Sequence, residues 1–300
     1  MTDDTPPLAQ TLVADLRAMG LVTGDPVLVR CATRPIAPRA KAVASTLLDA
    51  LIEVVGPTGT VVALTFTALQ SAKLKKVEAL FTDDARTTAG GFASAVLRHP
   101  DRKRSTHPAN SIAAIGAQAE FLTVGHDEQA LPFSWMRRLI EVGGKQIVIG
   151  CVADSPGLST VHFTQEELGL AGKSFLAGSE GCYVADAGDT SHWAARNDIP
   201  GCSGGFWKLY SPYVRAGILR AGHIGEAYSI MASAADSAAV ELPILTADPN
   251  AALCDRPECL SCGSWSYSRR RLPRFGLAML GMKAAAARNK ILGRKGRTRA

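Results

Sequence analysis

One candidate for proton-transfer chemistry is the histidine of the segment GLSTVHFTQEEL, residues 157–168. On a helix, Gln165 and Glu166 lie three and four residues after His162, so all three share a face. An imidazole has a pKa near ~6.5, and a hydrogen-bonding partner fixes its tautomer, so His162 suits the role of a general base. The alternative is a solvated surface pair between His162 and a glutamate.

A second polar cluster is RSTHPANSIAAIG, residues 104–116, where an arginine, a serine and a histidine precede an apolar run. The run 111–115 predicts a short buried strand closed by a glycine. Pro108 biases His107 toward an extended backbone at the mouth of this strand. Such polar groups are consistent with ligand binding. The alternative for His107 is a structural histidine that holds the loop.

Other catalytic patterns are missing from the sequence. It contains neither a GxxxxGK[ST] phosphate loop nor a GxSxG nucleophile turn. Cys31 and Cys151 belong to predicted buried strands, where nothing in the sequence would lower the pKa of a thiol, so we expect both to be inert.

A run of cysteines, CDRPECLSCG, stands near the end of the chain. It supplies three thiols, Cys254, Cys259 and Cys262, whereas tetrahedral zinc takes four ligands. His223 or Cys202 would have to come from far along the sequence to complete a site. The sequence therefore predicts no bound metal, and it gives this run no role.

These residues are spaced along alternating strands and helices. Apolar residues at helical spacing predict helices over 8–19, 40–55, 92–98 and 133–141. Apolar and β-branched runs predict strands over 26–30, 60–67, 111–115 and 145–151. Beyond about residue 170, short strands and glycine-rich turns follow, with one more helix near 227–239. The pattern predicts a single mixed-sheet α/β domain flanked by helices, with an elaborated β-rich C-terminal half.

The position of His162 agrees with this architecture. Its segment directly follows the apolar strand 145–151. Ligands of α/β sheets bind beyond the C-terminal ends of the strands, so the sequence places a polar, histidine-bearing helix where a ligand would lie.

Composition and charge narrow the protein class. The 300 residues are 47% hydrophobic, with no apolar run of membrane-spanning length and no basic, apolar leader of the secretory type. The seven cysteines are an odd number spread along the chain, which is typical of reduced thiols, and we expect a cytoplasmic protein.

The net charge of +6 is unevenly distributed. Residues 269–300 hold eleven Lys and Arg and no acidic residue, which leaves 22 basic and 27 acidic residues in 1–268. This is not the composition of a core that binds nucleic acid. We predict an α/β domain over 1–268 and a basic extension over 269–300. The extension is either a solvated tail or a docking segment for an anionic membrane surface or an acyl carrier protein.

Together the two polar clusters resemble the aminoglycoside 3-N-acetyltransferase family. The resemblance extends from about residue 8 to about residue 262. It is supported by GDPVLV (24–29), VVGPTGTVVALTFT (54–67), LPFSWMRRLIEVGGKQIVIG (131–150), CSGGFWKL (202–209) and GILRAGHIGEAYSIM (217–231).

The resemblance implies direct transfer of an acyl group from coenzyme A to an amine, with acetyl-CoA as co-substrate. His162 would be the general base, because a protonated amine is not a nucleophile. The RSxHPxxS stretch would line the coenzyme A channel, where arginine suits phosphate geometry. The residues carried over to this channel are Arg104, Ser105, His107 and Ser111.

The sequence also departs from the family pattern. Arg30, Cys31 and Ala32 replace a His-Ser-Ser segment that would line the donor site in the family, and Gln165 replaces a carboxylate. A Gly-rich segment is shortened to Phe-Ser-Trp, which leaves Ser134 as its polar residue. The adjacent Trp135 either stacks on a sugar ring or fills the core.

These departures affect the predicted substrate more than the fold. Aminoglycosides are polycations, and the acidic residues near the predicted site are few, namely Asp154, Glu166 and Glu167. We therefore expect an acetyltransferase for an amino sugar of a surface polysaccharide or secondary metabolite. Two alternatives remain open: a catalytically idle relative that serves in binding or assembly, and an acyltransferase fed by a carrier protein.

Overall fold

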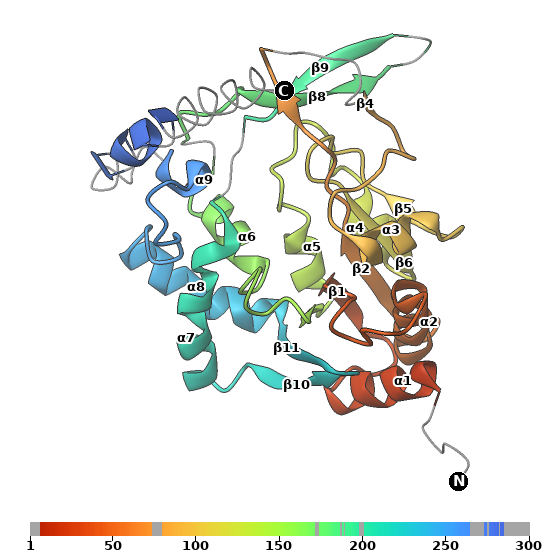
Figure 1. The fold of residues 1–300 in the computed structure, drawn as a ribbon. Coiled ribbons are helices and arrows are strands. Elements are labelled where there is room, and N and C mark those ends of the chain that lie inside the picture. Colours follow the sequence, from red (N-terminus) through yellow and green to blue (C-terminus); the bar gives the residue numbers. More distant parts are fainter. Residues whose placement is uncertain are drawn as a thin grey trace, which may run out of the picture.

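The computed structural model describes residues 7–73, 80–171, 174–186, 188, 190–197, 201–264, 273–274, 276–281 and 283–284. Most of the predicted basic extension, 269–300, lies outside these residues. A seven-stranded sheet forms the centre, with helices on both faces and a four-stranded sheet at one end (Figure 1). None of the described helices combines the length and hydropathy that crossing a bilayer requires.

The central sheet is mixed. Its strands, in spatial order, are β10 (Arg220–Ile224), β11 (Ala227–Ser233), β7 (Lys145–Ile149), β1 (Pro26–Cys31), β2 (Thr60–Leu64), β6 (Ile112–Gly116) and β5 (Lys103–Arg104). Strands β7, β1 and β2 run parallel, and β11 and β6 flank them antiparallel. The mixed α/β sheet that the sequence predicts is confirmed.

Alternation along the strands builds the two helical layers. Val27 and Val29 of β1 face one layer, and Leu28 faces the other. The first layer consists of α1 (Leu8–Ala18), α2 (Val43–Val55) and α3 (Gly91–Arg98). The second consists of α4 (Ala119–Thr123), α5 (Met136–Glu141), α6 (Thr160–Glu167), η1 (Ser203–Leu209), α7 (Tyr210–Arg215) and α8 (Ala234–Ala247).

The smaller sheet and a short last helix come largely from the C-terminal half. Strand β8 (Glu180–Ala185) pairs with β9 (Ser191–Ala195), β3 (Gln70–Ser71) and β4 (Leu80–Phe81). Helix α9 (Leu260–Gly263) follows α8. These elements form the elaboration that the sequence predicts beyond residue 170.

One predicted element is wrong. The helix expected near 227–239 is instead strand β11 over 227–233, followed by α8 from Ala234. Strand β11 is buried against β7 and both helical layers, so its apolar run has no strand-like alternation to distinguish it from a helix. The boundary is set by Ser233, whose side chain accepts the Asp236 N–H at 3.3 Å as an N-cap.

Candidate active site

His162 sits on α6 between two phenylalanine rings. Its ring centroid lies 4.5 Å from that of Phe133 and 4.7 Å from that of Phe206. Burial lowers the pKa of His162 to about 3, and the positive charge of Arg30 adds to this effect. Nδ1 lies 3.2 Å from Oε1 of Gln165, whose hydrogen bond acts in the opposite direction. The imidazole is therefore neutral at physiological pH.

Glu166 supports this site in a different way from the one predicted. Its buried carboxylate accepts the Phe133 N–H at 2.9 and 3.1 Å, so it holds the segment whose ring packs on His162. The hydrogen bond of His162 Nδ1 is with Gln165, whereas the sequence had offered Glu166 as its partner. The surface-pair alternative does not hold, because Gln165 and Glu166 are both buried.

Arg30, at the end of β1, reaches the loop that follows β7. Its Nη1 donates to the Gly157 carbonyl at 2.8 Å, and its Nη2 donates to the Ser155 carbonyl at 2.6 Å and Oγ at 2.5 Å. Burial raises the pKa of the thiols of Cys31 and Cys151, consistent with the inert thiols that the sequence predicts.

Two hollows are lined in part by the loop after β7. A cavity of about 270 Å³ opens at the carboxyl ends of β1 and β2 and is lined by Arg30, Cys31, Phe66, Phe92, Cys151 and Ser155, among others. A wider cleft of about 600 Å³ is lined by Asp154, Trp207, Tyr210, Glu226 and Tyr228, among others. Segment 150–155 contributes to both linings and leads directly into the helix that carries His162.

Glycine is required where this loop begins. Gly150 has φ +68°, and a Cβ there would lie 2.9 Å from the Ala32 carbonyl oxygen. The close approach of the two chains lets segment 150–155 turn across the end of β1. A side chain at position 150 would push this shared wall away from both hollows.

Arg104 is a structural brace in this fold. Its Nη1 donates to the carbonyls of Thr82, Asp83 and Ala85 at 3.3, 2.9 and 2.7 Å. Its Nη2 donates to the Thr65 carbonyl at 3.1 Å. These bonds direct the guanidinium at loop carbonyls, so the geometry does not support the direct phosphate contact predicted for Arg104.

The serines of the same stretch are similarly engaged. Ser111 Oγ donates to the Thr65 carbonyl at 2.8 Å and also accepts from Arg104 Nε at 3.2 Å. Ser105 Oγ accepts the Ile112 N–H at 2.9 Å and lies 2.9 Å from Nδ1 of His126. Both serines are buried, and both tie the β5–β6 hairpin to its surroundings.

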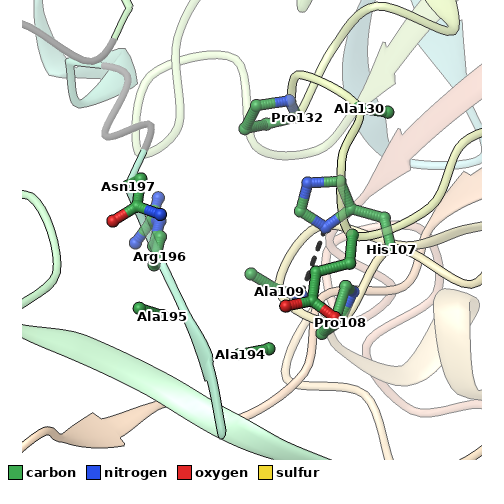
Figure 2. A pocket seen from close by; sticks show the side chains of 10 residues that line it. His107, Pro108, Ala109, Ala130, Pro132, Ala194, Ala195, Arg196 and Asn197 are labelled. Carbon is green, nitrogen blue, oxygen red and sulfur yellow. Dashed lines mark hydrogen bonds between the residues drawn. The ribbon is translucent and has the colours of Figure 1, made fainter.

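His107 holds its own loop. Nδ1 accepts the N–H groups of Ala109 and Asn110 at 3.2 and 3.1 Å, and the ring lies 4.8 Å from that of His126. Burial lowers the pKa of His107 to about 4. Figure 2 shows this ring and Pro132 facing the chain at the end of β9 across a cavity of about 50 Å³. That volume has room for water, and the coenzyme A contact expected of His107 stays a prediction.

The two residues singled out in the shortened segment, Ser134 and Trp135, also make structural contacts. Ser134 Oγ donates to the Leu131 carbonyl at 2.9 Å. Trp135 is 2% exposed and packs in the core beneath the sheet. Of the two roles predicted for it, sugar stacking and core filling, this position matches core filling.

Several residues of the site were not predicted from the sequence. The two rings that flank His162 lie in stretches quoted for the resemblance, but only tertiary packing brings them together. Glu241 of α8, fully buried, accepts hydroxyl hydrogen bonds from Thr160, Thr164 and Tyr213 at 2.6, 2.8 and 2.6 Å. Burial raises the pKa of Glu241 to about 7. It anchors α6 from behind.

Arg104→Lys tests the brace. We expect the free energy of unfolding to fall by about 2–4 kcal/mol, because buried carbonyls lose their donors. Acetyl-CoA affinity, measured by calorimetry, should stay close to the wild-type value. The neighbouring exposed Lys103→Ala, which breaks only a surface ion pair with Glu120, is the control. Wild-type stability with lost acetyl-CoA affinity would instead favour the phosphate contact.

Comparison with known proteins identifies the family of this chain. Residues 28–244 match a family described as aminoglycoside 3-N-acetyltransferase. Aminoglycoside N(3)-acetyltransferase VII of Streptomyces paromomycinus is 30% identical over 190 residues, 58% of this chain and 65% of the relative. Aminoglycoside N(3)-acetyltransferase III of Salmonella sp is 28% identical over 177 residues, 54% of this chain and 61% of the relative. The matched part of the chain thus spans less than two thirds of these relatives.

Solved structures show the same fold. AAC-IIIb in a binary complex with CoASH has a TM-score of 0.66 at 25% identity, covering 80% of this chain and 96% of that one. Sisomicin-bound AAC-VIa has a TM-score of 0.67 at 25% identity, covering 81% and 99%. The family match covers well over half of the sequence. This chain belongs to the aminoglycoside 3-N-acetyltransferase family.

Proposed function

We propose that this protein transfers an acetyl group from acetyl-CoA directly to the amine of an amino sugar or a related metabolite. Family membership supports the reaction class, and the solved relatives include one with CoASH and one with sisomicin. The observation that carries the proposal is segment 150–155, which lines both hollows and leads into the helix of His162. A donor and an acceptor bound in the two hollows would meet across it.

His162 is the proposed base. With Gln165 Oε1 accepting from Nδ1–H, the lone pair lies on Nε2 and can take the proton of the attacking amine. The new N–C bond forms, the C–S bond of the thioester breaks, and the proton passes from His162 to the departing coenzyme A thiolate. Binding both substrates in attack geometry supplies a large part of the rate.

The cavity at the ends of β1 and β2 is the proposed donor site. Arg30 and Cys31 line it, as predicted for the acyl-donor wall, and Phe66 adds an apolar surface. In this arrangement Arg104, Ser105 and Ser111 support the wall of the cavity from outside its lining. Arg104 and Ser111 both bond the Thr65 carbonyl, directly before Phe66. In this proposal they shape the donor cavity without touching coenzyme A.

The wider cleft is the proposed acceptor site. It combines the carboxylates of Asp154 and Glu226 with the half-exposed rings of Trp207 and Tyr228. Rings that stack on sugar faces and carboxylates that attract ammonium groups suit an amino sugar. Two carboxylates are few for a polycation, which favours an acceptor with one or two amines.

A catalytically idle relative is the second candidate. The observation that favours it is the partner of His162, which is the neutral amide of Gln165 and not a carboxylate. An amide stabilises an imidazolium less than an anion does. The carrier-protein donor and the membrane docking predicted for 269–300 concern residues mostly outside the described part of the chain, and they stay predictions.

Calorimetric titration of acetyl-CoA into the full chain tests the proposal first. We expect saturable binding, followed by release of coenzyme A thiol when amino sugars and aminoglycosides are screened as acceptors. Binding without turnover of any acceptor would favour the idle relative. A protein that binds no acetyl-CoA would contradict the donor proposal.

The acceptor cleft has its own test in the double variant Asp154→Asn/Glu226→Gln. Removing two exposed carboxylates should raise KM for a cationic acceptor by about 5–30-fold, at up to about 1 kcal/mol for each charge. The dissociation constant of acetyl-CoA should not change. Glu53→Gln, on the far helix α2, is the control. An unchanged KM would place the acceptor elsewhere.

A further inference from the structure

Four cysteines from two distant parts of the chain converge on one point. Cys202 directly precedes η1, and the other three belong to the segment around α9. The Sγ atoms of Cys202, Cys254, Cys259 and Cys262 all lie within 4.8 Å of one another. Cys202 supplies the fourth thiol that the sequence run 254–263 lacks, so the reason for predicting no metal no longer holds.

The spacing of the sulfurs suits a tetrahedral ion. Zinc thiolates have Zn–S bonds of about 2.3 Å, which gives S···S edges of about 3.8 Å in a tetrahedron. Cys202 Sγ lies 3.5 Å from the Sγ of both Cys259 and Cys262. A disulfide would need about 2.05 Å and would join only two of the four. A shared central ion requires all four sulfurs to lie close to one another, and these do so within 4.8 Å.

The surroundings match a thiolate site. Nη2 of Arg256 lies 3.8 Å from Cys202 Sγ, close enough to offset the negative charge of a zinc tetrathiolate. A hydrogen-bonding contact of this kind orients and stabilises a metal ligand.

The two segments are also pressed together. A Cβ on Gly205 would lie 2.4 Å from the carbonyl oxygen of Leu253, directly before Cys254. Lys208 of η1 donates to the Leu253 carbonyl at 2.8 Å and to Asp255 at 2.6 Å. The contact is therefore a built junction between η1 and the segment 253–262.

We propose that Cys202, Cys254, Cys259 and Cys262 bind one Zn²⁺ ion as thiolates and thereby fasten the segment 254–262 to the start of η1. Each thiol releases a proton to solvent as its S–Zn bond forms, and no oxidation state changes. Four protein ligands close the coordination sphere, so the ion is structural. It lies outside the acetyl-transfer site and needs no part of the proposed function.

The site nevertheless has a consequence for His162. Phe206, whose ring lies 4.7 Å from that of His162, follows Cys202 by four residues on η1. The metal fixes the start of η1, so it is a positioning element for this ring. Loss of the ion would loosen one wall of the imidazole pocket while leaving the sheet intact.

Metal analysis of the full chain, purified under reducing conditions, tests the proposal without any activity assay. We expect one zinc per chain by plasma mass spectrometry, and release of that zinc when a mercurial blocks the thiols. Cobalt in its place should give the intense sulfur-to-metal absorption of a tetrahedral tetrathiolate. Chelation should lower the Tm, because an ion bound only by the folded state stabilises it.

Matched serine variants locate the ligands. Cys202→Ser and Cys259→Ser should each weaken zinc affinity by about tenfold or more. Cys182→Ser, which changes a buried thiol of β8 outside the cluster, should keep one zinc. A wild-type chain that takes up no zinc, that holds iron instead, or whose mass is lower by the two hydrogens of a disulfide would overturn the proposal, even if the variants fail to fold.

Discussion

His162→Ala is expected to lower kcat for acetyl transfer by about 10²–10⁴-fold, the range that a positioned general base contributes. The neutral imidazole has a lone pair on Nε2 that can take the proton of the attacking amine. Thiol release from acetyl-CoA, with an acceptor identified by screening, measures the effect. Acetyl-CoA affinity should be retained, because the ring lies between Phe133 and Phe206 and not among the residues that line the donor cavity.

His99→Ala, which removes an imidazole just after α3 that lines neither hollow, is the matched control and should keep wild-type kcat. Wild-type kcat in His162→Ala would exclude the proposed base. A fall in Tm larger than that of the control would show that a folding defect contributes to the loss of kcat.

Gln165→Glu separates a base from a merely structural histidine. A carboxylate beside the imidazole raises the pKa of His162 from its value of about 3, because an anion favours the charged form. The base works only when neutral, so activity falls as pH falls through that pKa. The acidic limb of kcat should therefore move to higher pH in the variant. The acceptor amine titrates equally in both proteins, and an unmoved limb would contradict the assignment.

The free energy of unfolding should fall steeply as the pH is lowered from about 6 to about 4.5. This range lies above the pH at which carboxylates usually titrate. Burial lowers the pKa of His107 to about 4, and that of His126 and His162 to about 3. Between pH 6 and 4.5 the unfolded chain holds a proton on each of these histidines, and the folded chain does not. Stability contributed by them is therefore present above pH ~6.5 and is lost as pH falls.

Glu241 acts in the opposite direction. Its pKa is raised to about 7, so in the same window the folded chain holds a proton that the unfolded chain lacks. Three protons against one leave a net uptake of about two on unfolding. At about 1.4 kcal/mol per proton and pH unit, the free energy of unfolding should fall by up to about 2–3 kcal/mol per pH unit.

Urea unfolding at pH 6.0, 5.5 and 5.0 measures this slope. His107→Asn should reduce it by about one proton, about 1.4 kcal/mol per pH unit. The Asn side-chain oxygen can accept the same loop N–H groups as Nδ1, so the fold is kept. A wild-type stability that does not vary over this range would contradict the neutral, buried histidines.

The sequence predicted those elements whose pattern is unambiguous. Helix α1, strand β1 and helix α3 were expected within a residue or two of their bounds, because periodic apolar residues mark them. The strand 227–233 was taken for a helix because a mostly buried strand shows little alternation. Boundaries shifted where tertiary contacts decide them, as at α2, which begins at Val43 and not at residue 40.

The surroundings of His162 were predictable only in part, and its role as a base stays a prediction. The sequence put His162 beyond a parallel strand, and helix geometry brought Gln165 within reach of it. The sequence could not show that Arg104 donates to carbonyls of a loop about twenty residues away. A guanidinium can bind either a phosphate or a backbone oxygen. Nor could the sequence bring Cys202 to Cys254, since about fifty residues and five elements separate them.

The packing of His162 between two rings also makes the imidazole observable. Its carbon-bound protons lie within the ring currents of Phe133 and Phe206, so their NMR signals should be displaced from those of a free histidine. The two rings belong to segments on either side of α6 in the sequence. A single resonance pair thus reports whether these three segments are assembled, with or without substrate, and whether the proposed base stands ready.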